Sequence, residues 1–250
     1  MLSETLLNQH LSQPFRYFES VDSTNNIAQS WLRDGADVLS VVIADEQRKG
    51  RGRRGRIWYT PPNVALAVSV ILKPTTQFAP RISMVGALAV YDMCQYLNIN
   101  EVGIKWPNDV QIAGKKVSGI LPEAVWQDDR LLGVALGMGV NVRNQLDGDL
   151  SDTATTLSSE TSEPLHRAKL IAYLLERVAY WYSLIQKDDL VLAWKARLNT
   201  IGQTVTVTGD NINIVGQAVD IDPDGALLIE KMDGSIQRVL AGDVSLRPAQ

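Results

Sequence analysis

A cluster of positive charge constrains this chain more than any other feature of its sequence. Six cations fall within the nine positions from Arg48 to Arg56, three glycines are interspersed among them, and Trp58 follows two residues later. The whole chain of 250 residues carries a formal net charge of −4. Because like charges at this density repel one another, the segment cannot be part of a core. Arginine pairs well with phosphate and carboxylate, so the run predicts a surface loop that binds a small anion.

The main alternative for such a run is a nucleic-acid or localisation patch, which is a common meaning of short basic segments. The acidic balance of the rest of the chain argues against it, since a long polyanion needs an extended basic face. A single aromatic closes the run, whereas surfaces for single-stranded nucleic acid usually offer several. Small-anion binding is therefore the preferred interpretation, and a nucleic-acid-binding module stays open as the alternative.

The overall composition is that of a globular protein and excludes several functional classes. Apolar residues make up 45% and charged residues 21% of the chain. The apolar stretches are too short to span a bilayer and no secretory signal is visible, so we expect no membrane association and a cytoplasmic location. The single cysteine, Cys94, excludes an internal disulfide and is expected to be a buried thiol. The two isolated histidines argue against a Cys/His or Ser/His/Asp hydrolase and against a zinc site.

Hydrophobic periodicity predicts alternating helices and strands up to about residue 198. Helices are expected over 23–32, 81–97 and 164–186, and strands over 38–44, 64–72, 102–106, 109–112, 117–121 and 131–142. The stretch 144–161 is polar and has no regular period. After residue 198, strands are expected over 203–208, 212–221, 226–231 and 236–240, separated by turn-forming sequences. These four short strands predict a small β-barrel that leans on the larger domain.

Three further motifs contain residues suited to ligand binding, although each has an ordinary structural explanation. Pro107 fixes the turn in Lys105–Asp109, where Asn108 and Asp109 project, but an Asn-Asp turn needs no ligand. The segment 115–121 resembles the return strand of a hairpin, with Lys116 near the turn. The segment Gly137–Asn141 offers two glycines on which a ligand could lie, or it forms a simple bulge. The spacing of Gly50, Gly52 and Gly55 fits a dinucleotide fingerprint only formally, because no helix follows.

Taken together, these segments resemble the bacterial biotin protein ligases, which attach biotin to acetyl-CoA carboxylase. The matching segments are Ser23–Asn25, Gln47 with 50–58, 105–109, 116–121 and 137–141. The resemblance covers nearly all of the chain. It implies an α+β fold in which a central mixed β-sheet is flanked by helices, as in class II synthetases, with a small C-terminal SH3-like β-barrel. We expect a catalytic domain over 1–197 and the barrel over 198–250.

The resemblance implies a two-step reaction in which ATP activates biotin as biotinyl-5′-AMP and a lysine of the biotin carboxyl carrier protein then accepts it. The implied catalytic residues are Arg51, Arg53, Lys105 and Lys116. The implied biotin-binding residues are Ser23, Thr24, Asn25, Gln47, Gly50, Arg51, Gly52, Arg53, Lys116, Gly119, Gly137 and Gly139. The implied ATP-binding residues are Arg53, Arg54, Arg56, Trp58, Asn108, Asp109, Lys116 and Asn141. Mg²⁺ is expected to accompany ATP, but its protein ligands are not identified.

The resemblance also carries expectations about partners and alternatives. Only 22 residues precede Ser23, too few for the winged-helix domain of regulatory members, so we expect a monofunctional ligase without direct DNA binding. The chain is expected to be a monomer or a homodimer. A lipoate or octanoate ligase on the same fold is the closest alternative function, although such enzymes generally lack the arginine run. The glycine–arginine loop is expected to be mobile when empty, because its charges repel and its glycines cost entropy to order.

Overall fold

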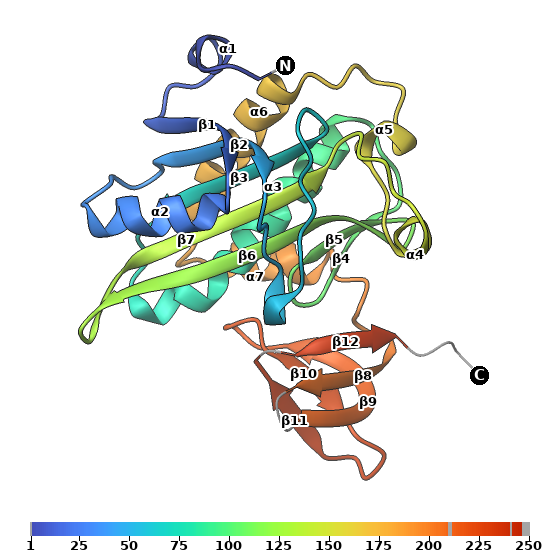
Figure 1. Cartoon of the computed structure of the whole chain (residues 1–250). Helices are drawn as coiled ribbons and strands as arrows, with labels where there is room; N and C mark the ends of the chain where they lie inside the picture. The colour runs from blue at the N-terminus through green and yellow to red at the C-terminus, as the bar shows by residue number, and fades with distance from the viewer. Residues whose placement is uncertain (1, 210–211, 241, 247–250) are drawn as a thin grey trace.

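A mixed seven-stranded β-sheet is the centre of the fold in the computed structural model, which describes residues 2–209, 212–240 and 242–246. Its strand order is β1-β2-β3-β7-β6-β5-β4 (Figure 1). Strands β1 and β2 pair in parallel and the other neighbours are antiparallel. The strands are β1 (Phe15–Val21), β2 (Val41–Gln47), β3 (Ala65–Leu72), β4 (Val102–Lys105), β5 (Asp109–Ile112), β6 (Lys115–Gln127) and β7 (Arg130–Asn141).

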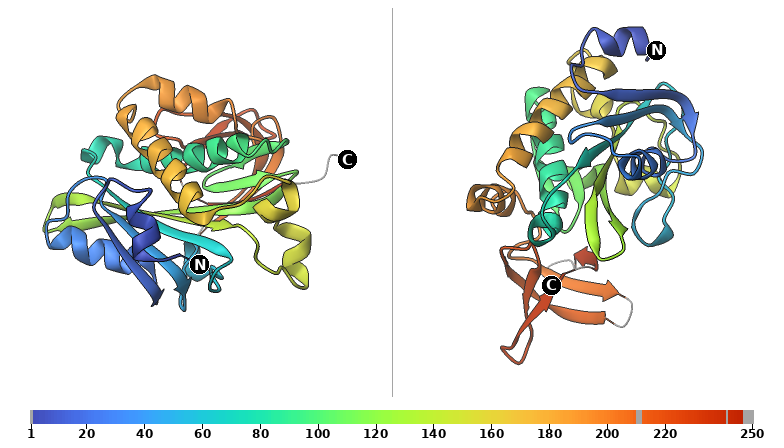
Figure 2. Two further views of the ribbon diagram at one scale, coloured as in Figure 1. Left: turned by 90° about the horizontal axis from the view of Figure 1, so that it is seen from above. Right: turned by 90° about the vertical axis from the view of Figure 1, so that its left-hand side faces the viewer.

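One face of this sheet is covered by helices α3 (Ile82–Tyr96), α6 (Arg167–Ser183) and α7 (Asp188–Lys195) (Figure 2). Helix α3 is buried almost all round, as expected for a helix whose sequence is apolar on every side. The main core lies between these helices and alternate residues of the strands, for example Val41 and Ile43 of β2. None of the helices in the described residues has the length and hydropathy of a membrane-crossing segment.

The opposite face carries helix α2 (Thr24–Arg33), which packs over part of the sheet (Figure 1). Ala28 and Leu32 of this helix contact alternate strand residues that point to this side, such as Ile71 and Ala135. Because α2 is short, it does not extend over the strand residues beyond its N-terminus. This uncovered part of the face is where a ligand can reach the sheet.

A second, antiparallel sheet follows α7, with strand order β11-β10-β9-β8-β12. Its strands are β8 (Thr204–Gly209), β9 (Ile212–Ile221), β10 (Leu227–Glu230), β11 (Ile236–Val239) and β12 (Asp243–Leu246). Two buried side chains from the part of the chain that forms the seven-stranded sheet donate hydrogen bonds to the β9–β10 turn of this second sheet. The Trp106 indole reaches the Gly225 carbonyl at 2.8 Å, and Arg81 Nε reaches the Pro223 carbonyl at 2.9 Å. Both bonds attach the small sheet to the large one.

The structure confirms the expected α+β class, with a mixed sheet flanked by helices and a small C-terminal β-unit. Several elements were not predicted: α1 (Glu4–Asn8), β1, α7 and β12. The stretch 144–161 contains two short helices, α4 (Asp149–Thr153) and α5 (Leu157–Glu160), each too short to leave a periodic pattern. Strand β6 extends to Gln127 rather than 121, because Pro122 interrupts the pattern without ending the strand.

Burial of Cys94 leads to a prediction about its reactivity. The side chain is fully buried on α3, and this burial raises the pKa of the thiol to about 12. Because the thiolate is the reactive form, iodoacetamide at pH 8 should leave Cys94 unmodified in the native protein and alkylate it in denaturant. Mass spectrometry of the intact protein measures this directly. Rapid alkylation of the native protein would show that the α3 packing opens.

Candidate functional site

The uncovered part of the sheet forms the floor of a cavity of about 590 Å³. Gly137 and Gly139 of β7 and Gly119 of β6 line it, and they point to the same side as α2 because the side-chain period of a strand is two. Two of these positions require glycine because an added Cβ would clash with a neighbouring side chain. A Cβ at Gly137 would lie 2.5 Å from Asn25 Oδ1, and one at Gly139 would lie 2.2 Å from Trp58 Nε1. The absence of side chains here lets a flat group lie against the backbone.

The N-terminus of α2 forms a polar wall at one end of this floor. Gln47, the last residue of β2, accepts hydrogen bonds through Oε1 from the Thr24 amide at 2.9 Å and the Thr24 hydroxyl at 3.0 Å. The side chain of Gln47 thereby satisfies an orphan amide of the helix, while the Ser23 side chain makes no capping bond. The buried Ser69 hydroxyl contacts Thr24 Oγ1 at 2.8 Å and Asn25 Oδ1 at 2.6 Å. The wall therefore presents donors and acceptors in fixed positions.

The basic run forms a short hairpin over the cavity, which we call the flap (residues 50–58). The Gly52 amide donates to the Arg56 carbonyl at 2.7 Å, and the Trp58 amide donates to the Gly50 carbonyl at 2.9 Å. The tip is a 3-10 turn over Arg53–Gly55, in which Arg54 has a φ of 54°. Arg54 Nη1 donates to the Thr208 carbonyl at 3.0 Å, so the tip reaches β8 of the small sheet (Figure 1).

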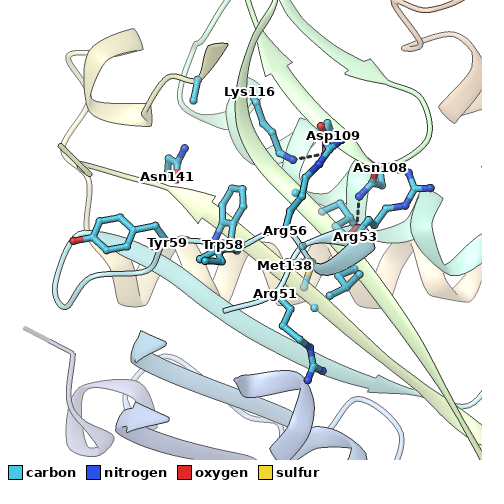
Figure 3. A pocket seen from close by; sticks show the side chains of 18 of the residues that line it. Arg51, Arg53, Arg56, Trp58, Tyr59, Asn108, Asp109, Lys116, Met138 and Asn141 are labelled. Atoms are coloured by element: carbon cyan, nitrogen blue, oxygen red, sulfur yellow. Dashed lines mark hydrogen bonds and ion pairs between the residues drawn. The ribbon is translucent and has the colours of Figure 1, made fainter. Parts of the chain in front are cut away.

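The side chains of Trp58 and Lys116 lie at the centre of the cavity. Trp58 lies across the glycine floor, where its indole is adjacent to Gly139 and Gly119. Lys116 Nζ lies 5.4 Å from the centroid of the Trp58 ring and makes a 2.7 Å ion pair with Asp109 Oδ1 (Figure 3). The ammonium is therefore held above the floor between an aromatic face and a carboxylate.

The cavity is strongly cationic although the chain is acidic. Five cations line it, Arg51, Arg53, Arg56, Lys105 and Lys116, against the two carboxylates Asp109 and Asp152. Arg53 Nη1 donates to Asn108 Oδ1 at 3.1 Å, and Asn108 Nδ2 donates in turn to the Ile120 carbonyl at 2.7 Å. The turn after β4 thus anchors one arm of the flap, and the surplus of positive charge suits a polyanionic ligand.

Arg51 points away from Arg53 and Arg56 (Figure 3). Its Nη2 donates to both carboxylate oxygens of Glu123, at 3.1 Å and 2.9 Å. Glu123 lies on β6 and also accepts a 2.6 Å hydrogen bond from Asn25 Nδ2. The flap and the polar wall therefore meet on one carboxylate.

The segment after β7 covers the other end of the cavity. Ala154 forms a parallel bridge with Lys116, and the Thr155 amide donates to the Lys116 carbonyl at 2.9 Å. Asn141 Nδ2 donates to the Thr155 carbonyl at 3.1 Å. Leu146 and Leu150 of this segment add apolar surface to the lining. This end of the cavity combines apolar and amide groups beside the cations.

The structure brings most of the predicted site residues together around this cavity. Those that line it are Ser23, Thr24, Asn25, Gln47, Arg51, Gly52, Arg53, Arg56, Trp58, Lys105, Asn108, Asp109, Lys116, Gly119, Gly137, Gly139 and Asn141. Two others lie outside the lining. A Cβ at Gly50 would be 2.2 Å from the Trp58 carbonyl oxygen, so this glycine allows the flap strands to close, and Arg54 points to the small sheet.

Sequence reasoning missed Glu123, Ser69 and the cover formed by 146–154. Glu123 follows Gly119 and Leu121 at the strand period of two, a signal that was lost because β6 was ended at 121. Ser69 is a lone polar residue in the otherwise apolar strand β3, and this contrast was the available signal. The cover has no such signal, because its position depends on contacts with β6.

Comparison with known proteins places the sequence and the fold among ligases. Residues 17–141 match the model of the Biotin/lipoate A/B protein ligase family, and residues 200–247 match the Biotin protein ligase C terminal domain. The chain is 32% identical to the Bifunctional ligase/repressor BirA of Bacillus spizizenii over 98% of this chain and 76% of that protein. It is 32% identical to the Biotin--[acetyl-CoA-carboxylase] ligase of Paracoccus denitrificans over 83% and 90% of the two chains. A biotin protein ligase from Aquifex aeolicus, solved with biotin and ATP, is similar with a TM-score of 0.80 and 27% identity, covering 94% of this chain and 99% of that one.

The crowding at Gly137 gives a prediction about stability. Alanine at this position forces the buried Asn25 amide to move, so the free energy of unfolding should fall by about 1–3 kcal/mol. Urea denaturation measures the change. Gly52→Ala is the control, because a Cβ there meets its nearest atoms at 3.5 Å and its φ of −104° suits alanine. Equal stability of the two variants would contradict the assigned packing.

Proposed function

Because the chain belongs to the Biotin/lipoate A/B protein ligase family, we propose that it is an ATP-dependent biotin ligase. The enzyme activates biotin as biotinyl-5′-AMP and transfers it to a lysine of the biotin carboxyl carrier protein of acetyl-CoA carboxylase. The observation that carries this proposal is the cationic cavity itself: a side-chain-free floor, a wall of donors and acceptors, and an arginine flap above them. These features suit a flat neutral ring joined to an acidic group.

The first step joins two negatively charged reactants. A biotin carboxylate oxygen attacks the α-phosphorus of ATP, a new P–O bond forms, and the bond to the β-phosphate breaks to release pyrophosphate. Charge repulsion is the main obstacle, and fixed cations reduce it without reorganising during the reaction. We assign Lys116 to the bridging position between the carboxylate and the α-phosphate, with Arg53, Arg56 and Lys105 around the phosphates.

We assign the polar wall to the biotin ring. A ureido group has one carbonyl acceptor and two N–H donors, so it requires both donors and acceptors on the protein. Ser23, Thr24, Asn25 and Gln47 supply these within the lining. Gly137 and Gly139 line the floor beside the ring, and the flap with Arg51 covers it.

We assign the other end of the cavity to the nucleotide. Trp58 supplies an aromatic face, and Asn108 and Asn141 supply amide groups. Mg²⁺ would neutralise phosphate charge, and it is bound in proteins mainly by substrate phosphates with one or two carboxylates. Asp109 and Asp152 fit that requirement, and the described residues contain no cluster of three or more potential metal ligands.

In the second step the neutral ε-amine of the carrier lysine attacks the carbonyl carbon of the mixed anhydride. An amide bond forms, AMP leaves with the bonding electrons, and the amine loses a proton. A closed flap would protect the anhydride from water until the carrier arrives. We also propose that the catalytic and barrel domains divide near residue 198, and that the enzyme works in the cytoplasm without binding DNA.

Exchange of labelled pyrophosphate into ATP tests the first step. We expect exchange that depends on biotin, because only the reversible adenylation of biotin returns label to ATP. Lipoate in place of biotin is the control and should support little exchange. Exchange with lipoate but not biotin would assign the chain to the lipoate-type ligases, and exchange with neither would refute the proposed activity.

Removal of the Lys116 ammonium tests its assigned role. Lys116→Met keeps the aliphatic stem over Trp58 but removes the charge, so kcat for adenylation should fall about 100-fold to 1,000-fold. Lys195→Met is the matched control, since Lys195 also makes a 2.7 Å ion pair, with Asp220 of the small sheet. Similar losses in both variants would indicate that the effect is structural.

A further inference from the structure

We propose that Glu123 is a positioning residue that couples the flap to the wall assigned to the biotin ring. The starting observation is that one carboxylate bonds two segments that are far apart in the sequence. Arg51 Nη2 approaches its two oxygens at 3.1 Å and 2.9 Å, and Asn25 Nδ2 approaches Oε2 at 2.6 Å. The side chains of Arg51 and Glu123 are 38% and 29% exposed, so water only partly screens this pair.

Glu123 first sets the orientation of the Asn25 carboxamide. Asn25 Nδ2 donates to the Leu121 carbonyl at 3.1 Å and to Glu123, so Oδ1 must face the Ser69 hydroxyl at 2.6 Å. The opposite orientation would place Oδ1 against a carbonyl and a carboxylate, neither of which can donate. Glu123, a residue outside the wall, thus fixes the Asn25 carboxamide together with the Leu121 carbonyl and the Ser69 hydroxyl.

Glu123 then closes a continuous chain of polar contacts between the two ends of the flap. From Asn25 the chain passes through Ser69 and Thr24 to Gln47, whose Nε2 donates to the Thr60 hydroxyl at 3.3 Å. Thr60 follows the flap and pairs with Gln47 in a β-bridge. Arg51, the second residue of the flap, meets the other end of these contacts at Glu123. A ligand that engages the wall therefore acts on groups bonded to both ends of the flap.

The proposed coupling requires a carboxylate at position 123, because its two charged oxygens can accept from both donors, Arg51 and Asn25. In Glu123→Gln a single amide oxygen remains, and the new NH₂ faces either Arg51 or Asn25, both of which donate at this point. The flap should then separate from β6 more often. Among the described residues Glu123 is the carboxylate that pairs with Arg51, which makes it the residue to test.

Limited trypsin digestion of the ligand-free protein measures flap opening, because the segment 49–56 contains five cleavage sites: Lys49, Arg51, Arg53, Arg54 and Arg56. We expect cleavage within 49–56 to be about threefold to fivefold faster in Glu123→Gln than in wild type. Glu163→Gln is the matched control, since Glu163 also accepts an amide hydrogen bond, from Asn98 at 3.3 Å, on a distant surface. Unchanged flap cleavage in Glu123→Gln would overturn the proposal. Accelerated cleavage throughout the chain, with a lower Tm, would also overturn it, since Glu123 would then be structural.

Biotin titration tests the coupling and rests on the proposed function. Biotin should slow flap cleavage in wild type and slow it less in Glu123→Gln, and KM for biotin should rise about tenfold while KM for ATP is unchanged. An equal rise in both KM values would overturn the coupling. If biotin protects no variant while the ligand-free difference persists, the proposed function fails and the positioning role of Glu123 stands.

Discussion

Repulsion between positive charges is the constraint around which this structure is arranged. The flap contains several arginines, which a hydrophobic core could not accommodate. Three of them donate hydrogen bonds to oxygen atoms from other parts of the molecule. Arg53 is held by Asn108, Arg54 by the Thr208 carbonyl and Arg51 by Glu123. The lining of the cavity contains more cationic than carboxylate side chains, so the cavity can attract anions. The sheet beneath contributes the floor of the cavity, and the hairpin contributes the charge above it.

The hydrogen-bonded contacts that lead to Glu123 account for the fixed arrangement of polar side chains in the wall at the N-terminus of α2. Gln47 of β2 accepts from the first amide of α2, and Ser23 at the N-cap lines the cavity without making a capping bond. Thr24, Ser69 and Asn25 are all buried, so each polar atom needs a partner within the protein. Burial and hydrogen bonding together hold these side chains in one arrangement before any ligand arrives.

Much of this architecture could be predicted from the sequence because its signals are local. The apolar periods of α2, α3 and β7 and the glycine–arginine run were sufficient to predict these elements, and motif resemblance supplied the fold. Long-range contacts explain what was missed. Glu123 acts through residues 72 and 98 positions away in the chain, and the cover over 146–154 owes its place to a bridge with Lys116. Strand β1 was missed because its side chains alternate irregularly between exposed and half-buried positions.

The glycine floor has a thermodynamic consequence for the protein as a whole. Instead of a covering helix, β6 and β7 present Gly119, Gly137 and Gly139, and the side chains of Lys116, Asn25 and Trp58 lie against these glycines. The remaining cavity of about 590 Å³ gains further packing contacts only when a ligand binds, so a bound vitamin adds a partner that the sequence itself does not supply. The resistance of the folded state to heat is consequently not a fixed property of the chain. It rises with the logarithm of the free ligand concentration, and it reports how much vitamin the surroundings contain.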